Sequence, residues 1–217
     1  MRYRLRQVIS HPRRAVEVAV APEAPFYLIV GLGNPGREYR LTRHNIGFIC
    51  LDRLADRLDA AFTRVESRAL VTKTAYQSSR LVLAKPQTYM NLSGQAVSAL
   101  ARFYKVPIEH LLVVYDDVDL SLGTLRLRPG GSSAGQKGMQ SIIERLGSQD
   151  FPRLRLGIGR PPGRMDAASY VLQEFHPGEG ELLGATLERA VDAILTFVSE
   201  DLVTAMNRYN GTMESDN

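Results

Sequence analysis

The sequence is short of cysteine and has no long apolar run. Its single cysteine, Cys50, excludes an internal disulfide and fits a reducing compartment. No apolar stretch approaches the length that a membrane-spanning helix needs. We therefore expect a soluble, cytoplasmic protein with no membrane partner. Cys50 lies in IGFICLDRL, whose apolar spacing predicts a core position in a helix rather than a nucleophile.

Patterns that bind metals are also missing. No two histidines stand at the spacing of metal ligands, and a single cysteine allows no C-x-x-C pair. The four histidines are His11, His44, His110 and His176. The sequence therefore predicts no structural or catalytic metal, and we expect no other cofactor.

Basic residues are in slight excess. Lysine and arginine number 27 against 23 acidic residues, a net charge of +4. This balance suits a polyanionic partner, although a basic surface alone does not identify one. With 217 residues, of which 44% are hydrophobic, the chain is long enough to form one domain with a core.

Composition divides the chain into three parts. Residues 1–25 carry five arginines before the first acidic residue and end in the linker-like APEAP. We expect a poorly ordered N-terminal extension here; a transit segment and a misassigned start are the alternatives. Residues 26–210 form the predicted domain, and residues 211–217 a C-terminal tail.

Within the domain, strand and helix patterns alternate. Strand-like runs lie at 26–32, 69–76, 79–86, 110–120, 123–131 and 153–159. Helical spacing occupies 42–60, 91–106, 134–147 and 180–200, with an Asn or Ser cap expected for the second helix and Gly147 closing the third. This order predicts a single three-layer α/β domain around one sheet.

The first strand ends in GLGNPG, whose glycines fit the G-x-G-x-x-G of a dinucleotide-binding turn. Such a site begins its helix at the third glycine. Here the polar stretch REYRLTRHN comes first, and Asp52, the candidate ribose ligand, falls in mid-helix. We favour a rigid turn that presents the amide of Asn34. A nucleotide-dependent oxidoreductase is the remote alternative.

His44 follows this turn, and Asp116 and Asp117 end the apolar run HLLVVYDD. If the two strands run parallel, a carboxylate reaches the same sheet edge as His44, where ligands usually bind in open α/β sheets. A carboxylate bonded to imidazole fixes its tautomer and stabilises its protonated form, which suits a general base. Acids that merely cap a loop are an equal alternative on spacing alone.

A second catalytic pattern is G-x-S-x-G around Ser133, with Asp150 or Asp166 and then His176 in the order of a hydrolase triad. The preceding strand is charged, however, and a Pro-Gly pair separates it from the serine. We favour a glycine-rich loop whose amides meet a phosphate or a carbonyl. A small-ester hydrolase that uses Ser133 is a rival.

Other polar residues have two interpretations each. Tyr89 is a core residue or a stacking platform, and Asn91 is a helix cap or an amide that points into a cleft. Arginines alternate along two strands, which places each pair on one strand face. They form either solvated faces or a phosphate clamp, because the guanidinium fork matches phosphate oxygens. These residues are Arg126, Arg128, Arg153 and Arg155.

Taken together, LIVGLGNPGREYRLTRHNIG, KPQTYMNLSG, VVYDDVDLSLG and RLRLGIGRP resemble the bacterial peptidyl-tRNA hydrolase family over about residues 26–209. The resemblance implies a monomer with no obligate protein partner, built on a mixed twisted sheet enclosed by helices. It implies hydrolysis of the ester between a peptide and the 3′ ribose of tRNA, which recycles tRNA from prematurely released peptidyl-tRNA.

The resemblance also implies roles for individual residues. His44 matches the general base and Asp116 the acid that orients it. Asn34 and Asn91 match asparagines that hold the peptide and the scissile region, and Asn34 is also implied to distinguish blocked from free aminoacyl groups.

The remaining implied residues contact the tRNA. Tyr39 and Tyr89 match residues that line the site for the tRNA end. Arg128 and Arg155 fall where the family places a basic clamp for the 5′ phosphate.

One departure concerns the glycine-rich loop. The family often has a His-Asn pair where this chain has Gln136 and Lys137, so the roles of these two residues are open. A non-catalytic RNA-binding protein is a further rival, because some relatives of this fold bind RNA without hydrolysis. The presence of Asn34, His44, Asn91 and Asp116 argues against it.

Overall fold

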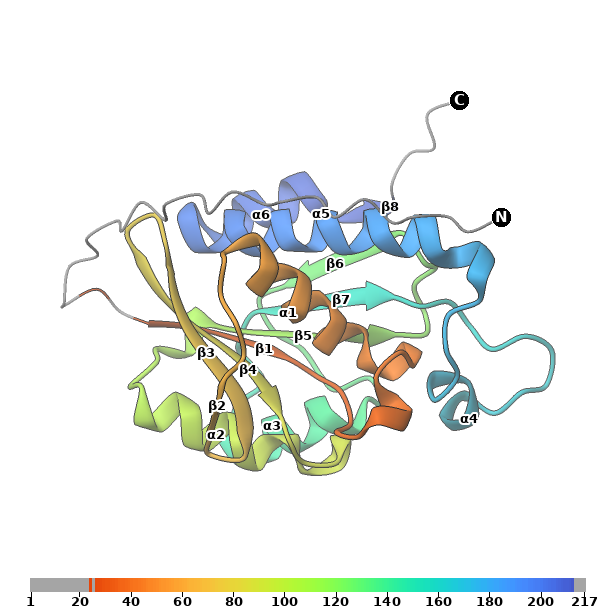
Figure 1. The fold of residues 1–217 in the computed structure, drawn as a ribbon, viewed down its shortest axis with the longest axis horizontal. Coiled ribbons are helices and arrows are strands. Elements are labelled where there is room, and N and C mark those ends of the chain that lie inside the picture. Colours follow the sequence, from red (N-terminus) through yellow and green to blue (C-terminus); the bar gives the residue numbers. More distant parts are fainter. Residues whose placement is uncertain (1–23, 25, 213–217) are drawn as a thin grey trace, which may run out of the picture.

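The computed structural model describes residue 24 and residues 26–212. The predicted extension at residues 1–25 thus lies outside the described residues, apart from residue 24. The predicted domain forms three layers, with helices on both faces of one sheet (Figure 1). The predicted α/β class and the mixed sheet enclosed by helices are confirmed.

The sheet has eight strands in the order β2-β3-β4-β1-β5-β7-β6-β8. The four central strands β4, β1, β5 and β7 run parallel, and the strands on either side of them pair antiparallel. Their bounds are β1 Phe26–Gly31, β2 Arg64–Glu66, β3 Ala69–Tyr76, β4 Ser79–Pro86, β5 Leu111–Asp117, β6 Thr124–Arg128, β7 Arg153–Gly157 and β8 Gly211–Thr212.

Helices cover both faces of this sheet. One face carries α1 (Ile46–Arg57), α5 (Gly180–Ser199) and α6 (Leu202–Tyr209), and the other carries α2 (Ser93–Phe103) and α3 (Lys137–Leu146). The short α4 (Ala167–Val171) lies beyond the end of the strands (Figure 1). In the described part of the chain, no helix has the length and apolarity to cross a bilayer.

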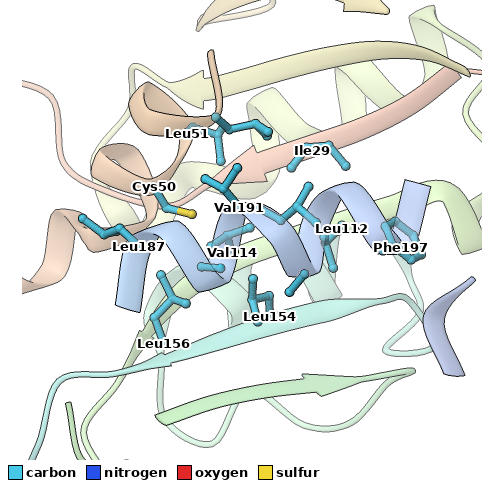
Figure 2. Packing of buried hydrophobic residues seen from close by; sticks show 14 of the residues in the cluster. Ile29, Cys50, Leu51, Leu112, Val114, Leu154, Leu156, Leu187, Val191 and Phe197 are labelled. Carbon is cyan, nitrogen blue, oxygen red and sulfur yellow. The ribbon is translucent and has the colours of Figure 1, made fainter. Parts of the chain in front are cut away.

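The central strands are apolar because both of their faces are covered. In β1, Ile29 points into a cluster with α1 and α5, whereas Leu28 and Val30 pack on the opposite face with α2 and α3. Figure 2 shows side chains of α1, α5 and the sheet meeting in the first cluster. Cys50 belongs to that cluster, and burial raises the pKa of its thiol to about 12. Its prediction as a core residue is confirmed.

Several local predictions can be compared with the structure. Gly147 ends α3 with φ 69°, and its N–H donates to the Ile143 carbonyl, as predicted. The expected Asn or Ser cap of α2 is wrong, because the 3-10 helix η3 (Met90–Leu92) leads directly into α2. The Ser93 hydroxyl donates to the Met90 carbonyl instead.

The C-terminal end adds one strand. β8, formed by the first two residues of the predicted tail, pairs with β6. The sheet therefore extends two residues past the predicted domain boundary at residue 210.

Candidate active site

The site lies where β1 and β5 end. These strands are parallel neighbours, and the Leu32 N–H donates to the Val114 carbonyl at 2.9 Å just after β1. The GNPG turn and the acidic end of β5 therefore meet at one edge of the sheet. The sequence analysis predicted this arrangement on the condition that the two strands run parallel, and they do.

The glycines of the turn serve close packing against the start of α1. A Cβ on Gly31 would lie 2.3 Å from the Gly47 carbonyl oxygen, and one on Gly33 would lie 2.8 Å from the Phe48 ring. Neither position has room for a side chain. The first two glycines of the G-x-G-x-x-G pattern are thus explained by the approach of the turn to α1, whereas Gly36 has φ 118° and lies ten residues before α1 begins.

His44 and Asp116 form a hydrogen-bonded pair. His44 lies in the 3-10 helix η2 (Arg43–Asn45), and its Nδ1 is 2.8 Å from Asp116 Oδ2. Both side chains are mostly buried, at 15% and 3% exposure. An ionised carboxylate only accepts hydrogen bonds, so Nδ1 is the donor in this contact, and a neutral imidazole then has its lone pair on Nε2. The pair has the geometry of a general base and its orienting acid.

Asn34 is fixed by a residue that sequence reasoning missed. The Asn45 side chain accepts from the Asn34 N–H at 2.8 Å and donates to the Asn34 carbonyl at 2.9 Å. The Asn34 side-chain oxygen accepts from the Met90 N–H at 2.8 Å. The amide NH₂ of Asn34, at the cavity wall, is thereby left as a donor. Nothing in the local sequence distinguishes Asn45 from an ordinary polar residue.

These groups line a cavity of about 630 Å³. Its polar side is formed by the β1, β5 and glycine-rich loops and by the turn before α2. It includes Asn34, His44, Tyr89, Asn91, Asp116, Ser133, Gln136 and Lys137. Its apolar side is formed by Val118 and by residues in and around α4, namely Ala167, Ala168, Val171 and Leu172. A cavity with one apolar wall and convergent polar groups suits an organic substrate.

The buried side chain of Arg153 holds the glycine-rich loop in place through hydrogen bonds. This side chain is almost fully buried and donates to the carbonyls of Gly131 at 2.6 Å and Gln149 at 2.7 Å. Burial lowers the pKa of its guanidinium. Arg153 thus serves the loop from within the fold rather than presenting a solvated strand face.

The Ser133 alternative does not assemble. Ser133 lines the cavity, but Asp150, Asp166 and His176 do not. Asp166 instead caps α4, and His176 caps the 3-10 helix η5 (Pro177–Glu179). The histidine that shares the cavity with Ser133 is His44.

Three predicted tRNA-binding residues lie outside the cavity lining. Tyr39 is half-buried in the 3-10 helix η1 (Arg37–Tyr39), and Arg128 is exposed at the end of β6. Arg155 on β7 pairs with Asp117. In the β6–β7 register, Arg126 is the cross-strand partner of Arg155 and Arg128 that of Arg153, so each of these arginine pairs shares one face of the sheet.

The other two predicted binding residues line the cavity. Tyr89 is 63% exposed, and Asn91 is also exposed. Among the described residues, no three His, Cys, Asp or Glu side chains gather as a metal site would require.

The chain is similar to known proteins over nearly all of the predicted domain. The sequence model of the family described as "Peptidyl-tRNA hydrolase" matches residues 28–217. A peptidyl-tRNA hydrolase of Chloroflexus aggregans is 52% identical over 185 residues, which cover 85% of this chain and 98% of that protein. A chloroplastic peptidyl-tRNA hydrolase of Arabidopsis thaliana is 51% identical over 175 residues, or 80% of this chain and 61% of that protein.

A solved structure gives the same result. The crystal structure of peptidyl-tRNA hydrolase from Acinetobacter baumannii matches with a TM-score of 0.82 at 32% identity. The match covers 88% of this chain and 97% of that one.

Proposed function

Because the chain belongs to the peptidyl-tRNA hydrolase family and hydrolyses peptidyl-tRNA, we propose that His44 is the general base of this reaction. The single observation that carries the proposal is the 2.8 Å contact between His44 Nδ1 and Asp116 Oδ2. Membership of a hydrolase family argues against the alternative of a non-catalytic RNA-binding protein.

The reaction needs an activated water. His44 Nε2 takes a proton from the water as its oxygen attacks the ester carbonyl, and Asp116 stabilises the imidazolium that forms. When the tetrahedral intermediate collapses, the C–O bond to the ribose breaks. The proton on Nε2 then passes to the departing 3′ oxygen. Base and acid are thus the same nitrogen at successive steps, and no covalent enzyme intermediate is needed.

Developing negative charge on the carbonyl oxygen needs donors. The Asn34 NH₂ is suited to this, because its amide oxygen is already bonded to the Met90 N–H and its backbone is clamped by Asn45. Such a donor also meets the carbonyl of an N-blocked substrate, which supports a role in telling blocked from free aminoacyl groups. Asn91, exposed at the same cavity, holds the scissile region.

The tRNA itself is bound around the cavity. Tyr89, largely exposed at the cavity, offers a ring on which a 3′-terminal base stacks, and Tyr39 supports the same end. Arg128 and Arg155 form the clamp for the 5′ phosphate. Arg155 bonds Asp117 through Nε, so its two terminal nitrogens can still meet the phosphate beside the exposed Arg128.

We also propose that the enzyme acts as a cytoplasmic monomer without an obligate protein partner. The single buried thiol is compatible with a reducing compartment.

The pair is tested by Asp116→Asn, with Asp56→Asn on the exposed side of α1 as the matched control. The amide NH₂ introduced at position 116 would donate to Nδ1 and force the imidazole proton onto Nε2, which removes the base. We expect kcat on N-acetyl-aminoacyl-tRNA to fall roughly 10²–10⁴-fold, the usual range for a lost general base. Asp56→Asn should behave as the parent. Parent-like turnover by Asp116→Asn would overturn the assignment.

A further inference from the structure

Gln136 sits between two groups that the mechanism uses. It is the N-cap of α3, and its side-chain oxygen accepts from the Met139 N–H at 2.7 Å. Its side-chain nitrogen lies 3.2 Å from Asp116 Oδ1 and 3.3 Å from Met90 Sδ. The oxygen of Asp116 that Gln136 contacts is the one that His44 does not use.

The orientation of this amide is determined from both ends. The Met139 N–H is a donor, so the atom that faces it must be the amide oxygen. Asp116 accepts hydrogen bonds, so the atom that faces it must be the amide nitrogen. A flipped amide would set two donors together at α3 and two acceptors together at Asp116. Capping of α3 and contact with Asp116 therefore select the same orientation.

Met90 extends the connection to the other side of the cavity. Its N–H donates to the Asn34 side chain, while its sulfur meets the Gln136 amide. A Cβ on Gly138 would lie 2.5 Å from that sulfur, so the glycine gives Met90 room to reach α3. The turn after β1, the turn before α2 and the start of α3 are thereby joined around Asp116.

We propose that Gln136 is a positioning residue, which holds Asp116 in the rotamer that bonds His44. This inference rests on the proposed function of His44 as the base. Asp116 is buried at 4% exposure and lies at the end of β5, where its carboxylate would otherwise rotate about its own side-chain torsions. One oxygen held by Gln136 leaves the second directed at Nδ1. Gln136 does this without a titratable group of its own.

Several titratable side chains surround Gln136, and they determine how a charged residue at this position would behave. Titratable side chains that share the cavity are His44 from η2, Tyr115, Asp116 and Asp117 from β5, Asp119 from the following loop, Tyr89 from the turn before α2 and Lys137 from α3. Asp117 is already paired with Arg155. A second carboxylate at position 136 would thus face Asp116 at hydrogen-bond distance and repel it.

Two substitutions separate positioning from capping. Gln136→Asn keeps an amide that caps α3 but is one methylene too short for Asp116. Gln136→Glu keeps both the reach and the cap but replaces the donor by a repelling oxygen. Gln140→Glu, on the exposed side of α3, is the control for added charge on this helix. Kinetics on N-acetyl-aminoacyl-tRNA are compared across pH, with thermal melting to establish folding and His44→Ala as a parallel arm.

We expect both Gln136 variants to lose about tenfold in kcat, the low end for a hydrogen bond to a charged group, with KM within about twofold of the parent. Gln136→Glu should also move the acidic limb of the kcat profile to higher pH, because a second carboxylate favours the imidazolium. Gln140→Glu should change neither quantity.

Parent-like kcat in both folded Gln136 variants overturns the inference, as does a loss confined to the melting temperature or to KM. The His44→Ala arm keeps the two proposals apart. An inactive His44→Ala beside fully active Gln136 variants removes only the positioning role. An active His44→Ala removes the proposed base itself.

Discussion

Replacing Arg43 should destabilise the protein measurably. This nearly buried residue precedes His44 and donates two hydrogen bonds to Glu179, at 3.0 and 2.5 Å, and one to the Ile158 carbonyl at 3.2 Å. Its guanidinium lies 4.6 Å from the centre of the Tyr170 ring and 4.7 Å from that of Phe175. Arg43 thus fastens the segment around α4, which forms the apolar cavity wall, to the helix that carries the proposed base.

The magnitude follows from these contacts. Removing one partner of a buried ion pair costs about 3–5 kcal/mol. Glu179 keeps 29% of its side chain exposed and can rehydrate, which lowers the cost. Loss of the two aromatic contacts adds about 0.5–1 kcal/mol for each ring. For Arg43→Met, which retains the side-chain stem, we expect a loss of about 3 kcal/mol. That corresponds to a melting temperature lower by about 6–12 °C for a chain of this size.

Glu179→Gln tests the charge separately. Burial acts to raise the pKa of Glu179, but hydrogen bonds from Arg43 and the His176 N–H together lower it below its usual 4.5. A lowered folded-state pKa contributes stability that is present above pH 4.5 and is lost as the pH falls through the folded-state value. The stability advantage of the parent over Glu179→Gln should therefore shrink below that pH.

Urea unfolding at about pH 7 and at several values below the usual glutamate pKa measures both effects. The matched control is Arg57→Met, which removes an exposed pair with Glu188 and Asp192 at the surface. It should cost less than about 1 kcal/mol. An unfolding free energy of Arg43→Met equal to that of the parent would refute the argument. So would an advantage over Glu179→Gln that is independent of pH.

Two other expectations follow from burial and exposure. Cys50 has a buried thiol with a pKa of about 12, so it should not react with a thiol reagent at about pH 8 while the protein is folded. One reactive thiol per chain should appear on unfolding. Rapid labelling of the folded protein would contradict the packing. Arg128→Ala should weaken binding of 5′-phosphorylated tRNA and lower the salt dependence of binding by about one counterion. The control Arg53→Ala, on α1, should change neither. If the parent binds dephosphorylated tRNA with equal affinity, the proposed phosphate clamp is wrong.

The sequence predicted the parts of the site that depend on strand ends. Apolar runs locate β1 and β5, and their polar ends supply Asn34, His44 and Asp116. Once the strands are parallel neighbours, these side chains must meet at one edge. Spacing alone left loop-capping acids as an equal alternative, and the parallel pairing of β1 and β5 in the structure is what decides between them.

Residues that act across the chain could not be predicted in this way. Arg43 and Glu179 are separated by 136 positions, and Gln136 reaches Asp116 across 20. Neither pairing follows from periodicity, because both depend on how loops pack over the sheet edge. Asn45 clamps Asn34 only because η2 folds back on the turn. Polar residues in loops carry no local signal of their partners.

Short elements were missed for a related reason. α4 has five residues and β8 has two, too few for a periodic pattern to stand out. Such elements form because tertiary contacts stabilise them rather than local propensity. β8 exists through its pairing with β6, and α4 is held by Tyr170, whose hydroxyl donates to the Ile158 carbonyl at 2.9 Å.

The most direct test of the central claim is single-turnover release of N-acetyl-aminoacyl groups from tRNA by the parent, His44→Ala and Ser133→Ala, with a chelator present. Both substituted residues line the same cavity, so each variant is a control for the other. We predict that the parent cleaves in chelator, that Ser133→Ala stays within a few-fold of it, and that His44→Ala is slower by roughly 10²–10⁴. A larger loss for Ser133→Ala than for His44→Ala, or a parent silenced by the chelator, would contradict the account.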